Sequence, residues 1–252
     1  MIPLKELKKI ANKSGLTVYQ QEKDYLLKLF LYHYYESFED AVFKGGTCIK
    51  FIYGLPRFSE DIDFNIDISP ENFQKQIKSI MKKIKFTGIK TYFLKEEKFE
   101  QAYTCEIGFH GPLFKGTEQT RNKIRIDAGK RTGTILDIQW RVISSEYPEI
   151  KTNFLVKTMH EEEILVEKII SLMNRNKGRD LYDTWFLLEK GVLLNKKLFN
   201  KKTNMEFDIN NIPTKKEYHR DIEKLTNKIV SYNQILDVLR QKIEKTLNSH
   251  KN

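Results

Sequence analysis

The sequence contains little that could form covalent or metal cross-links. Only two of its 252 residues are cysteines, Cys48 and Cys105, and neither belongs to a Cys-x-x-Cys or Cys/His spacing. A disulfide framework or a zinc site is therefore not expected. We interpret both cysteines as small core residues of a protein in a reducing compartment.

Long apolar segments are absent too. No apolar run approaches the roughly 20 residues of a transmembrane helix, and the first residues lack the apolar centre of a signal peptide. These absences predict a cytoplasmic protein with no membrane partner. The chain is 40% hydrophobic, with 12 Tyr, 16 Phe and 2 Trp, which is enough for a sizeable core.

Acidic residues are outnumbered by basic ones. The chain has 34 Asp and Glu against 44 Lys and Arg, which gives a formal net charge of +10. A polyanionic partner fits this balance, and nucleic acid is the first candidate. Acceptor pockets for aminoglycosides tend to be acidic, so the same balance disfavours an antibiotic-modifying enzyme.

Two glycines and a threonine point to a phosphate-binding segment. Gly45 and Gly46 leave the backbone free to approach an anion closely. Thr47 follows at the expected start of a short helix, where its hydroxyl and the unpaired N–H groups favour negative charge. Taken alone, a Gly-Gly-Thr is more often a simple turn.

Residues 61–66 alternate between polar and apolar side chains, as a half-buried strand does. Asp61 and Asp63 therefore project from one face, opposite Ile62 and Phe64. Hard oxygen ligands in this arrangement suit Mg²⁺, which binds one or two carboxylates and completes its shell with water and substrate phosphates. We expect Asp61 and Asp63 to hold Mg²⁺ or Mn²⁺.

Joined by a helix-length spacer, these pieces resemble the signature of the AbiEii/AbiGii toxin family of the nucleotidyltransferase superfamily. The resemblance covers roughly residues 43–188, with gaps. The matching positions are Lys44, Gly45, Gly46, Thr47, Tyr53, Gly54, Leu55, Arg57, Ser59, Asp61 and Asp63. The resemblance implies substrate-binding roles for Lys44, Gly45, Gly46, Thr47, Arg57 and Ser59. An alternative for Arg57 is that it pairs with Glu60 or another nearby acid to fix the turn.

A third carboxylate is implied by the same resemblance, because in the superfamily an acidic residue on a nearby strand completes the metal site. The alternating stretch 123–128 places Asp127 on a sheet face, opposite Ile124 and Ile126. We expect Asp127 to be this ligand. The alternatives are that Asp127 merely ends a strand before a turn at Gly129, or that Asp137 takes the role.

Two later motifs also match the family. A capping box at residues 158–161 opens a helix in which Lys168 falls inside the apolar arc. A lysine rarely sits there without a charged partner. The resemblance implies that Lys168 and an aspartate join the active site. We favour Asp183 as the catalytic aspartate and keep Asp180, a candidate helix N-cap or supporting partner, as the alternative.

The element pattern predicts an α+β fold. A nucleotidyltransferase core, residues 1–142, is expected to contain a mixed antiparallel sheet flanked by helices, and residues 143–252 to form a helical domain. The expected helices are 21–38, 70–85 and 215–247, together with those that follow residues 158 and 179. Besides the strand at 61–66, the expected strands are 88–94, 103–109, 123–128 and 134–140.

The resemblance implies a metal-dependent nucleotidyltransferase toxin that transfers NMP from NTP to an acceptor. RNA is the expected acceptor, as tRNA 3′ ends are in some relatives. The setting would be a toxin–antitoxin or phage-defence system, with a separately encoded antitoxin as partner. The rival hypotheses are an antibiotic- or protein-modifying nucleotidyltransferase and a non-catalytic nucleic-acid-binding module.

The basic surplus is concentrated after residue 192, so this region is a candidate for gripping RNA phosphates. An ordinary solvated surface explains the same composition. The candidate lysines are Lys196, Lys197, Lys201, Lys202, Lys215 and Lys216. The alternative phosphate contacts, beside the predicted sheet, are Lys115, Arg121, Lys123 and Arg125.

Overall fold

The computed structural model describes residues 1–130 and 133–248. Contacts between residues divide the chain into two compact units. The first, called the sheet unit, comprises Met1–Ile52, Glu60–Gly133 and Gln139–Thr158. The second, called the helical unit, comprises Tyr53–Ser59, Thr134–Ile138 and Met159–Asn252. The domain boundary expected after residue 142 falls inside a strand of the sheet unit.

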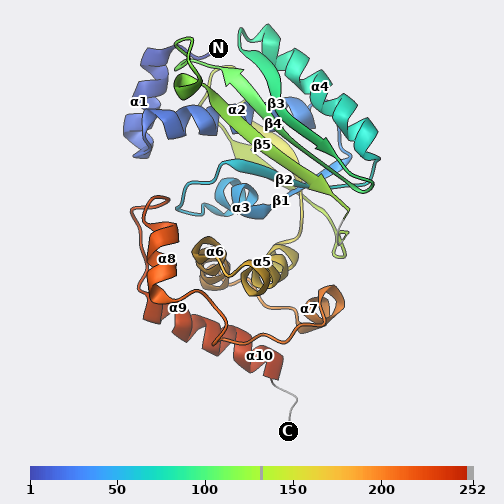
Figure 1. Cartoon of the computed structure of the whole chain (residues 1–252), viewed down its shortest axis with the longest axis vertical. Coiled ribbons are helices and arrows are strands. Elements are labelled where there is room, and N and C mark those ends of the chain that lie inside the picture. Colours follow the sequence, from blue (N-terminus) through green and yellow to red (C-terminus); the bar gives the residue numbers. More distant parts are fainter. Residues whose placement is uncertain (131–132, 249–252) are drawn as a thin grey trace. The chain divides into compact units, whose positions relative to one another are not determined.

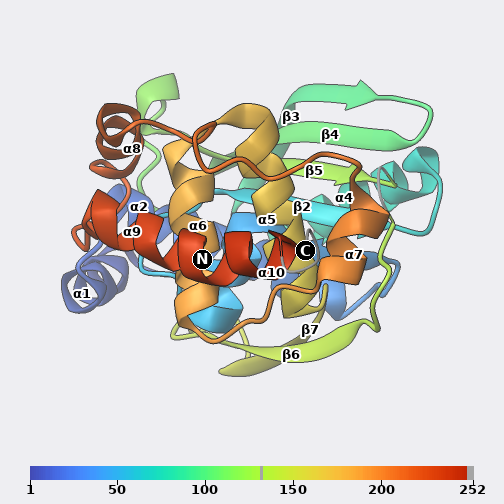
Figure 2. The same ribbon diagram turned by 90° about the horizontal axis from the view of Figure 1, so that it is seen from below.

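The sheet unit is built on a seven-stranded mixed sheet with the order β3-β4-β5-β2-β1-β7-β6. The pairs β2/β5 and β1/β7 are parallel, and the other neighbours are antiparallel. Figure 2 shows β3 and β6 at opposite edges. The strands are β1 Ala41–Lys44, β2 Asp61–Ile66, β3 Lys90–Lys98, β4 Ala102–His110, β5 Asn122–Gly129, β6 Gln139–Ser144 and β7 Asn153–Thr158.

Helices α2 (Val18–Tyr35) and α4 (Pro70–Phe86) cover one face of this sheet, and α1 (Leu4–Ser14) packs on α2 (Figure 1). Capping residues define the starts of the two longer helices. Thr17 and Gln20 form a capping box for α2, while the Ser69 side chain accepts a bond from the Asn72 backbone at the start of α4. The apolar side chains of β2, β4 and β5 point towards these helices and form the core. The predicted α+β class is confirmed.

The helical unit places α5 (Glu161–Arg175) beside α6 (Gly178–Glu189). The remaining helices of this unit are α7 Lys196–Lys202, α8 Lys215–Ile222, α9 Tyr232–Leu239, the π-helical turn η3 Arg240–Glu244 and α10 Lys245–Asn248. The predicted capping box at residue 158 is wrong. Thr158 ends β7, and His160 caps α5 by accepting a hydrogen bond from the Glu162 backbone. No helix in the described part of the chain is long and apolar enough to cross a bilayer.

Two further element predictions are wrong for identifiable reasons. The expected strand at 134–140 begins only at Gln139, because the N–H groups of Ile135 and Leu136 donate to the carboxylate of Glu163, each at 2.9 Å. The expected helix 215–247 is interrupted after Ile222. In that interruption, the Leu225 carbonyl and the Thr226 hydroxyl bond to the backbone of Phe58 and Pro56.

Candidate active site

The predicted metal ligands of the sheet unit share one face of the sheet. Asp61 and Asp63 alternate along β2 with buried Ile62 and Phe64, so both carboxylates project away from the helices. β2 and β5 run parallel, and their register places Asp63 beside Asp127. Neighbouring strands lie about 4.8 Å apart. The structure therefore brings Asp61, Asp63 and Asp127 to adjacent positions on one surface.

Asp127 is engaged by two side chains on the same face. Arg125 donates from Nε to Oδ2 at 2.8 Å and from Nη2 to Oδ1 at 3.2 Å, and the Thr104 hydroxyl donates to Oδ1 at 2.6 Å. Arg125 is two residues away on the same strand, so alternation alone would have signalled it. Thr104 could be found only from the β4/β5 register. The competitor Asp137 lies outside the sheet, in a segment of the helical unit.

The predicted phosphate-binding segment directly adjoins Asp63. Lys44 ends β1 opposite Asp63, and the short helix α3 (Gly45–Cys48) follows. Gly45 has a φ of 76°, and a Cβ added there would lie 2.0 Å from Asp63 Oδ2. No side chain fits this space, and L-residues are strained at this φ. Glycine at this position lets the backbone contact the carboxylate.

Two contacts fix this segment to the rest of the sheet unit. The Thr47 hydroxyl donates to the Asp61 carbonyl, which ties α3 to β2. In the π-helical turn η1 (Ile49–Tyr53), Lys50 forms an ion pair with the buried carboxylate of Asp24 on α2. Burial alone would raise the pKa of Asp24, but Lys50 and Lys28 outweigh it and the pKa is lowered. No local pattern in the sequence signals the Asp24–Lys50 pair.

The donor chemistry of the carboxylates fits a divalent cation. Asp61, Asp63 and Asp127 offer only oxygen ligands, which Mg²⁺ and Mn²⁺ prefer. The charge of Asp63 acts on the neighbouring segment, because burial first and then Asp63 raise the pKa of the Cys48 thiol. Within residues 1–130 and 133–248, no three His, Cys, Asp or Glu side chains are grouped to hold one ion. The three carboxylates fit a divalent cation in their donor chemistry and in their adjacent positions, but they are not gathered around one point, and Asp127 is bonded to Arg125 and Thr104.

The helical unit contains the later part of the same sequence motif. Residues 53–59 pack within it, and the Arg57 guanidinium binds Asp183 through two bonds of 2.6 Å, Nε to Oδ1 and Nη2 to Oδ2. Nη1 donates to the Phe58 carbonyl at 2.9 Å. Arg57 thus pairs with an acid, as the alternative interpretation expected, although the acid is Asp183. Glu60 instead pairs with Lys23 at 3.3 Å.

Lys168 on α5 lies in a buried charge cluster with two aspartates of α6. Its Nζ is 2.8 Å from Asp183 Oδ2 and 3.3 Å from Asp180 Oδ1. Arg175, which the sequence did not single out, adds a 3.0 Å contact to Asp180. Asp180 lies in the first turn of α6, whose N-cap is Lys177, so the N-cap interpretation is wrong. The charged partner expected for Lys168 is confirmed.

The ionisation of Asp183 depends on these cations. Its side chain is fully buried, and burial alone would raise its pKa. Arg57 and Lys168 outweigh that effect, so the pKa of Asp183 is lowered and the carboxylate stays charged. The cluster of Arg57, Lys168 and Asp183 is therefore an ion-paired network inside the helical unit.

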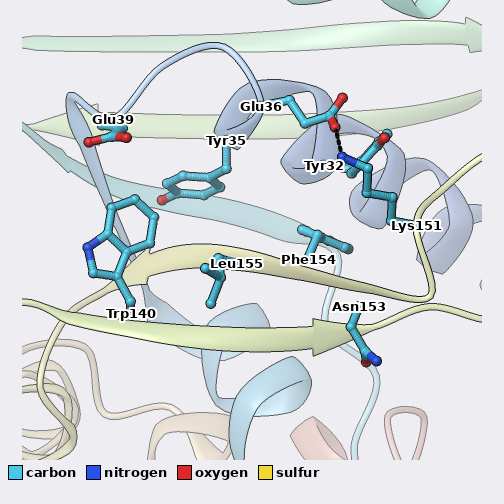
Figure 3. A pocket seen from close by; sticks show the side chains of 9 residues that line it. All are labelled: Tyr32, Tyr35, Glu36, Glu39, Trp140, Lys151, Asn153, Phe154 and Leu155. Atoms are coloured by element: carbon cyan, nitrogen blue, oxygen red, sulfur yellow. Dashed lines mark hydrogen bonds and ion pairs between the residues drawn. The ribbon is translucent and has the colours of Figure 1, made fainter.

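A cavity of about 660 Å³ in the sheet unit lies apart from the predicted residues. Figure 3 shows its aromatic lining, including Tyr35 and Trp140, and the ion pair between Glu36 and Lys151 at 2.7 Å. None of the predicted site residues lines it. The candidate active site is therefore the carboxylate face with the adjoining glycine segment.

Known proteins match this chain in sequence and in fold. Residues 29–248 match the family model described as nucleotidyl transferase AbiEii toxin, type IV TA system. No curated protein matches. The fold resembles that of MenT4, a nucleotidyltransferase toxin from Mycobacterium tuberculosis, with a TM-score of 0.69 and 15% identity over 98% of this chain and 90% of that one. It also resembles JHP933 from Helicobacter pylori, with a TM-score of 0.60 and 20% identity over 91% of this chain and 94% of that one.

Proposed function

This chain belongs to the AbiEii family of nucleotidyltransferase toxins, and we propose that it transfers NMP from an NTP to an RNA acceptor, with divalent metal ions as cofactor. A tRNA 3′ end is the first acceptor to test. Membership of a type IV toxin–antitoxin family implies an antitoxin as a separate partner. A role in phage defence is part of the proposal.

One observation supports the proposal most strongly. The backbone of Gly45 lies against the Asp63 carboxylate so closely that a Cβ would sit 2.0 Å from Oδ2. A segment suited to phosphates and a face of carboxylates are thus in direct contact. Nucleotide transfer needs the glycine segment and the carboxylates side by side, because the triphosphate must reach both the protein donors and the metal ligands.

In the proposed mechanism, Asp61 and Asp63, together with Asp127, would hold Mg²⁺ or Mn²⁺. A divalent ion bound there supplies charge neutralisation of the triphosphate and lowers the pKa of the acceptor hydroxyl. Lys44, Gly45, Gly46 and Thr47 bind phosphate oxygens in this proposal. The Thr47 hydroxyl gives its one proton to the Asp61 carbonyl and so holds the segment in place, and in this proposal its backbone N–H makes the contact with phosphate.

The proposed role of Lys168 is to neutralise charge on the departing pyrophosphate. Its ammonium has three N–H donors, and two of them face Asp180 and Asp183. The side chain is 11% exposed, and the proposal assigns its third donor to a phosphate oxygen. In this proposal Asp183 orients Lys168 and Arg57, and Arg57 and Ser59 hold the loop of residues 53–59 in shape.

The test is incubation of the purified protein with each α-labelled NTP, total cellular RNA and Mg²⁺ or Mn²⁺. We expect label in RNA with at least one nucleotide, release of pyrophosphate, and loss of both when EDTA is added. Label on protein in place of RNA would support the protein-modifying alternative. Absence of pyrophosphate with every NTP and metal would rule out catalysis.

Replacing Gly45 with alanine should reduce nucleotide transfer by about 100-fold. The added Cβ would collide with Asp63, and an ångström-scale displacement of a catalytic group costs about this factor. Gly15→Ala is the matched control, because Gly15 has a φ of 74° but nothing within 4 Å of its Cβ position. Both variants are strained, but only Gly45→Ala should lose pyrophosphate release at unchanged circular dichroism. Equal activity of the two variants would contradict the role of this contact.

A further inference from the structure

The sheet face that bears the carboxylates also carries a row of cations. On β5, Lys123 and Arg125 alternate with buried Ile124 and Ile126, so they project beside Asp127. Arg125 lies opposite Asp61 in the register of β2 and β5. Arg121 precedes β5. We call Arg121, Lys123 and Arg125 the cationic row; it begins at the carboxylates and leads away from them.

An aromatic cluster lies further along this face. Lys123 pairs in register with Gly108 of β4, which pairs with Tyr92 of β3. A Cβ at Gly108 would come within 3.1 Å of Tyr92 Cζ, so the absent side chain makes room for the ring over β4. Tyr92 meets His110 edge to face at 5.3 Å, and His110 stacks on Phe114 at 3.6 Å between ring centroids. We call Tyr92, His110 and Phe114 the aromatic cluster.

The cationic row and the aromatic cluster are in direct contact. Arg121 Cζ lies 5.6 Å from the centroid of the Tyr92 ring, and its Nη1 donates to the Tyr92 hydroxyl at 3.0 Å. Burial, followed by Lys90 and Arg121, lowers the pKa of His110, which favours its neutral imidazole. A neutral imidazole on a phenyl ring offers a stacking surface and adds no charge. Cations leading to stacked rings are the usual combination for binding single-stranded nucleic acid.

The cations of the row can change partners at little cost. Lys123 Nζ pairs with Glu106 at 2.8 Å, but the lysine side chain is 51% exposed. The Arg125 side chain, paired with Asp127, is 52% exposed. Exposed ion pairs contribute little free energy, so phosphate oxygens can replace the carboxylates.

We propose that this face of β3, β4 and β5 binds the single-stranded end of the RNA acceptor, with phosphates on the cationic row and bases on the aromatic cluster. This inference rests on the proposed function. Along β5, Lys123 is roughly 13 Å from Asp127 at about 3.3 Å per residue. A short single-stranded segment at the end of the RNA would span this distance. The terminal hydroxyl would then reach the carboxylates while upstream bases stack.

The test compares two double variants of the full chain that carry the same chemical changes. Lys123→Gln with Phe114→Ala alters the proposed surface. Lys82→Gln with Phe86→Ala is the control, because both residues are exposed on α4 and Phe86 is 91% exposed. Binding of a fluorescent single-stranded RNA oligonucleotide is measured by anisotropy without NTP, as a function of salt. Melting temperatures confirm folding, and Lys123→Gln alone serves if the double variant unfolds.

We expect the first double variant to bind RNA at least about tenfold more weakly, since stacking contributes strongly for each base. Its log–log salt slope should fall by about 0.7 because one phosphate contact is lost. The KM for RNA should rise while kcat at saturating RNA stays within about threefold. The control should bind like the wild type.

Other outcomes overturn the inference in distinguishable ways. If the wild type labels RNA but the first double variant binds it normally, the acceptor lies elsewhere and the proposed function stands. If RNA binding is unchanged while binding of an acidic antitoxin is lost, the surface is a protein interface. If the wild type neither binds nor labels RNA, the proposed function fails first, and this inference fails with it.

Discussion

Replacing Asp63 with asparagine should lower nucleotide transfer at least about 100-fold, a loss of about 3 kcal/mol of transition-state stabilisation. Asparagine keeps the shape of the side chain and removes its charge. Asp63 is the carboxylate with the most central position on the sheet face, since β1 places Lys44 opposite it and β5 places Asp127 opposite it. The rate of pyrophosphate release with labelled NTP measures the effect.

A second measurement separates metal binding from other roles of Asp63. Titration with Mn²⁺ in the absence of NTP should show weaker binding for Asp63→Asn than for the wild type. Asp67→Asn is the control, because Asp67 is exposed just beyond the end of β2. It should leave both readouts unchanged. Activity of Asp63→Asn within about threefold of the wild type, a difference below about 1 kcal/mol, would refute the assignment.

The sequence predicted the strand carrying these carboxylates because its signal is local. Alternation with a period of two specifies which face each side chain of β2 takes, whatever the strand pairs with. The same rule placed Asp127 on the correct face of β5. The partner strand was not predictable, since β2 and β5 are far apart in sequence and meet only through the parallel register.

Non-local pairing also explains why the sequence around Arg57 did not predict the partner of this residue. Although residues 44–63 are continuous in sequence, residues 53–59 belong to the helical unit. They are held there by contacts to residues 183, 225 and 226. From the sequence alone, Glu60 or another nearby acid was the expected partner of Arg57, because distance along the chain was the only guide. In the case of Lys168, by contrast, its position inside an apolar arc was enough to predict a charged partner.

Composition was a poor guide to one of the six C-terminal lysines proposed to bind RNA. Lys202 is not a solvated cation, because its side chain is 1% exposed and forms ion pairs with Glu163 at 2.7 Å and Glu167 at 2.9 Å. One of the six lysines proposed to bind RNA phosphates is therefore buried in ion pairs inside the helical unit. Counting charges cannot distinguish such a residue from an exposed one.

Replacing Asp183 with asparagine should destabilise the protein by about 3–5 kcal/mol, because two buried cations lose their shared anion. Arg57 is bound to both carboxylate oxygens, and Lys168 lies 2.8 Å from one of them. An amide offers a single acceptor oxygen and no charge. Urea unfolding at pH 7 measures the loss. Asp237→Asn, at a side chain that is 76% exposed in the same unit, should change stability by less than about 0.5 kcal/mol.

The pH dependence of the difference in unfolding free energy between the wild type and Asp183→Asn provides the sharper test. Because Arg57 and Lys168 hold the pKa of Asp183 below its usual value despite burial, the carboxylate is ionised in the folded protein at a pH where the unfolded chain already binds a proton. Its contribution to stability is therefore fully present above the unfolded-state pKa of about 3.9 and is lost as pH falls through the lower folded pKa. The gap in unfolding free energy between wild type and Asp183→Asn should be constant near neutral pH and shrink below about pH 4. A gap that stays constant down to pH 2.5, or that grows on acidification, would show that the charge of Asp183 does not stabilise the cluster.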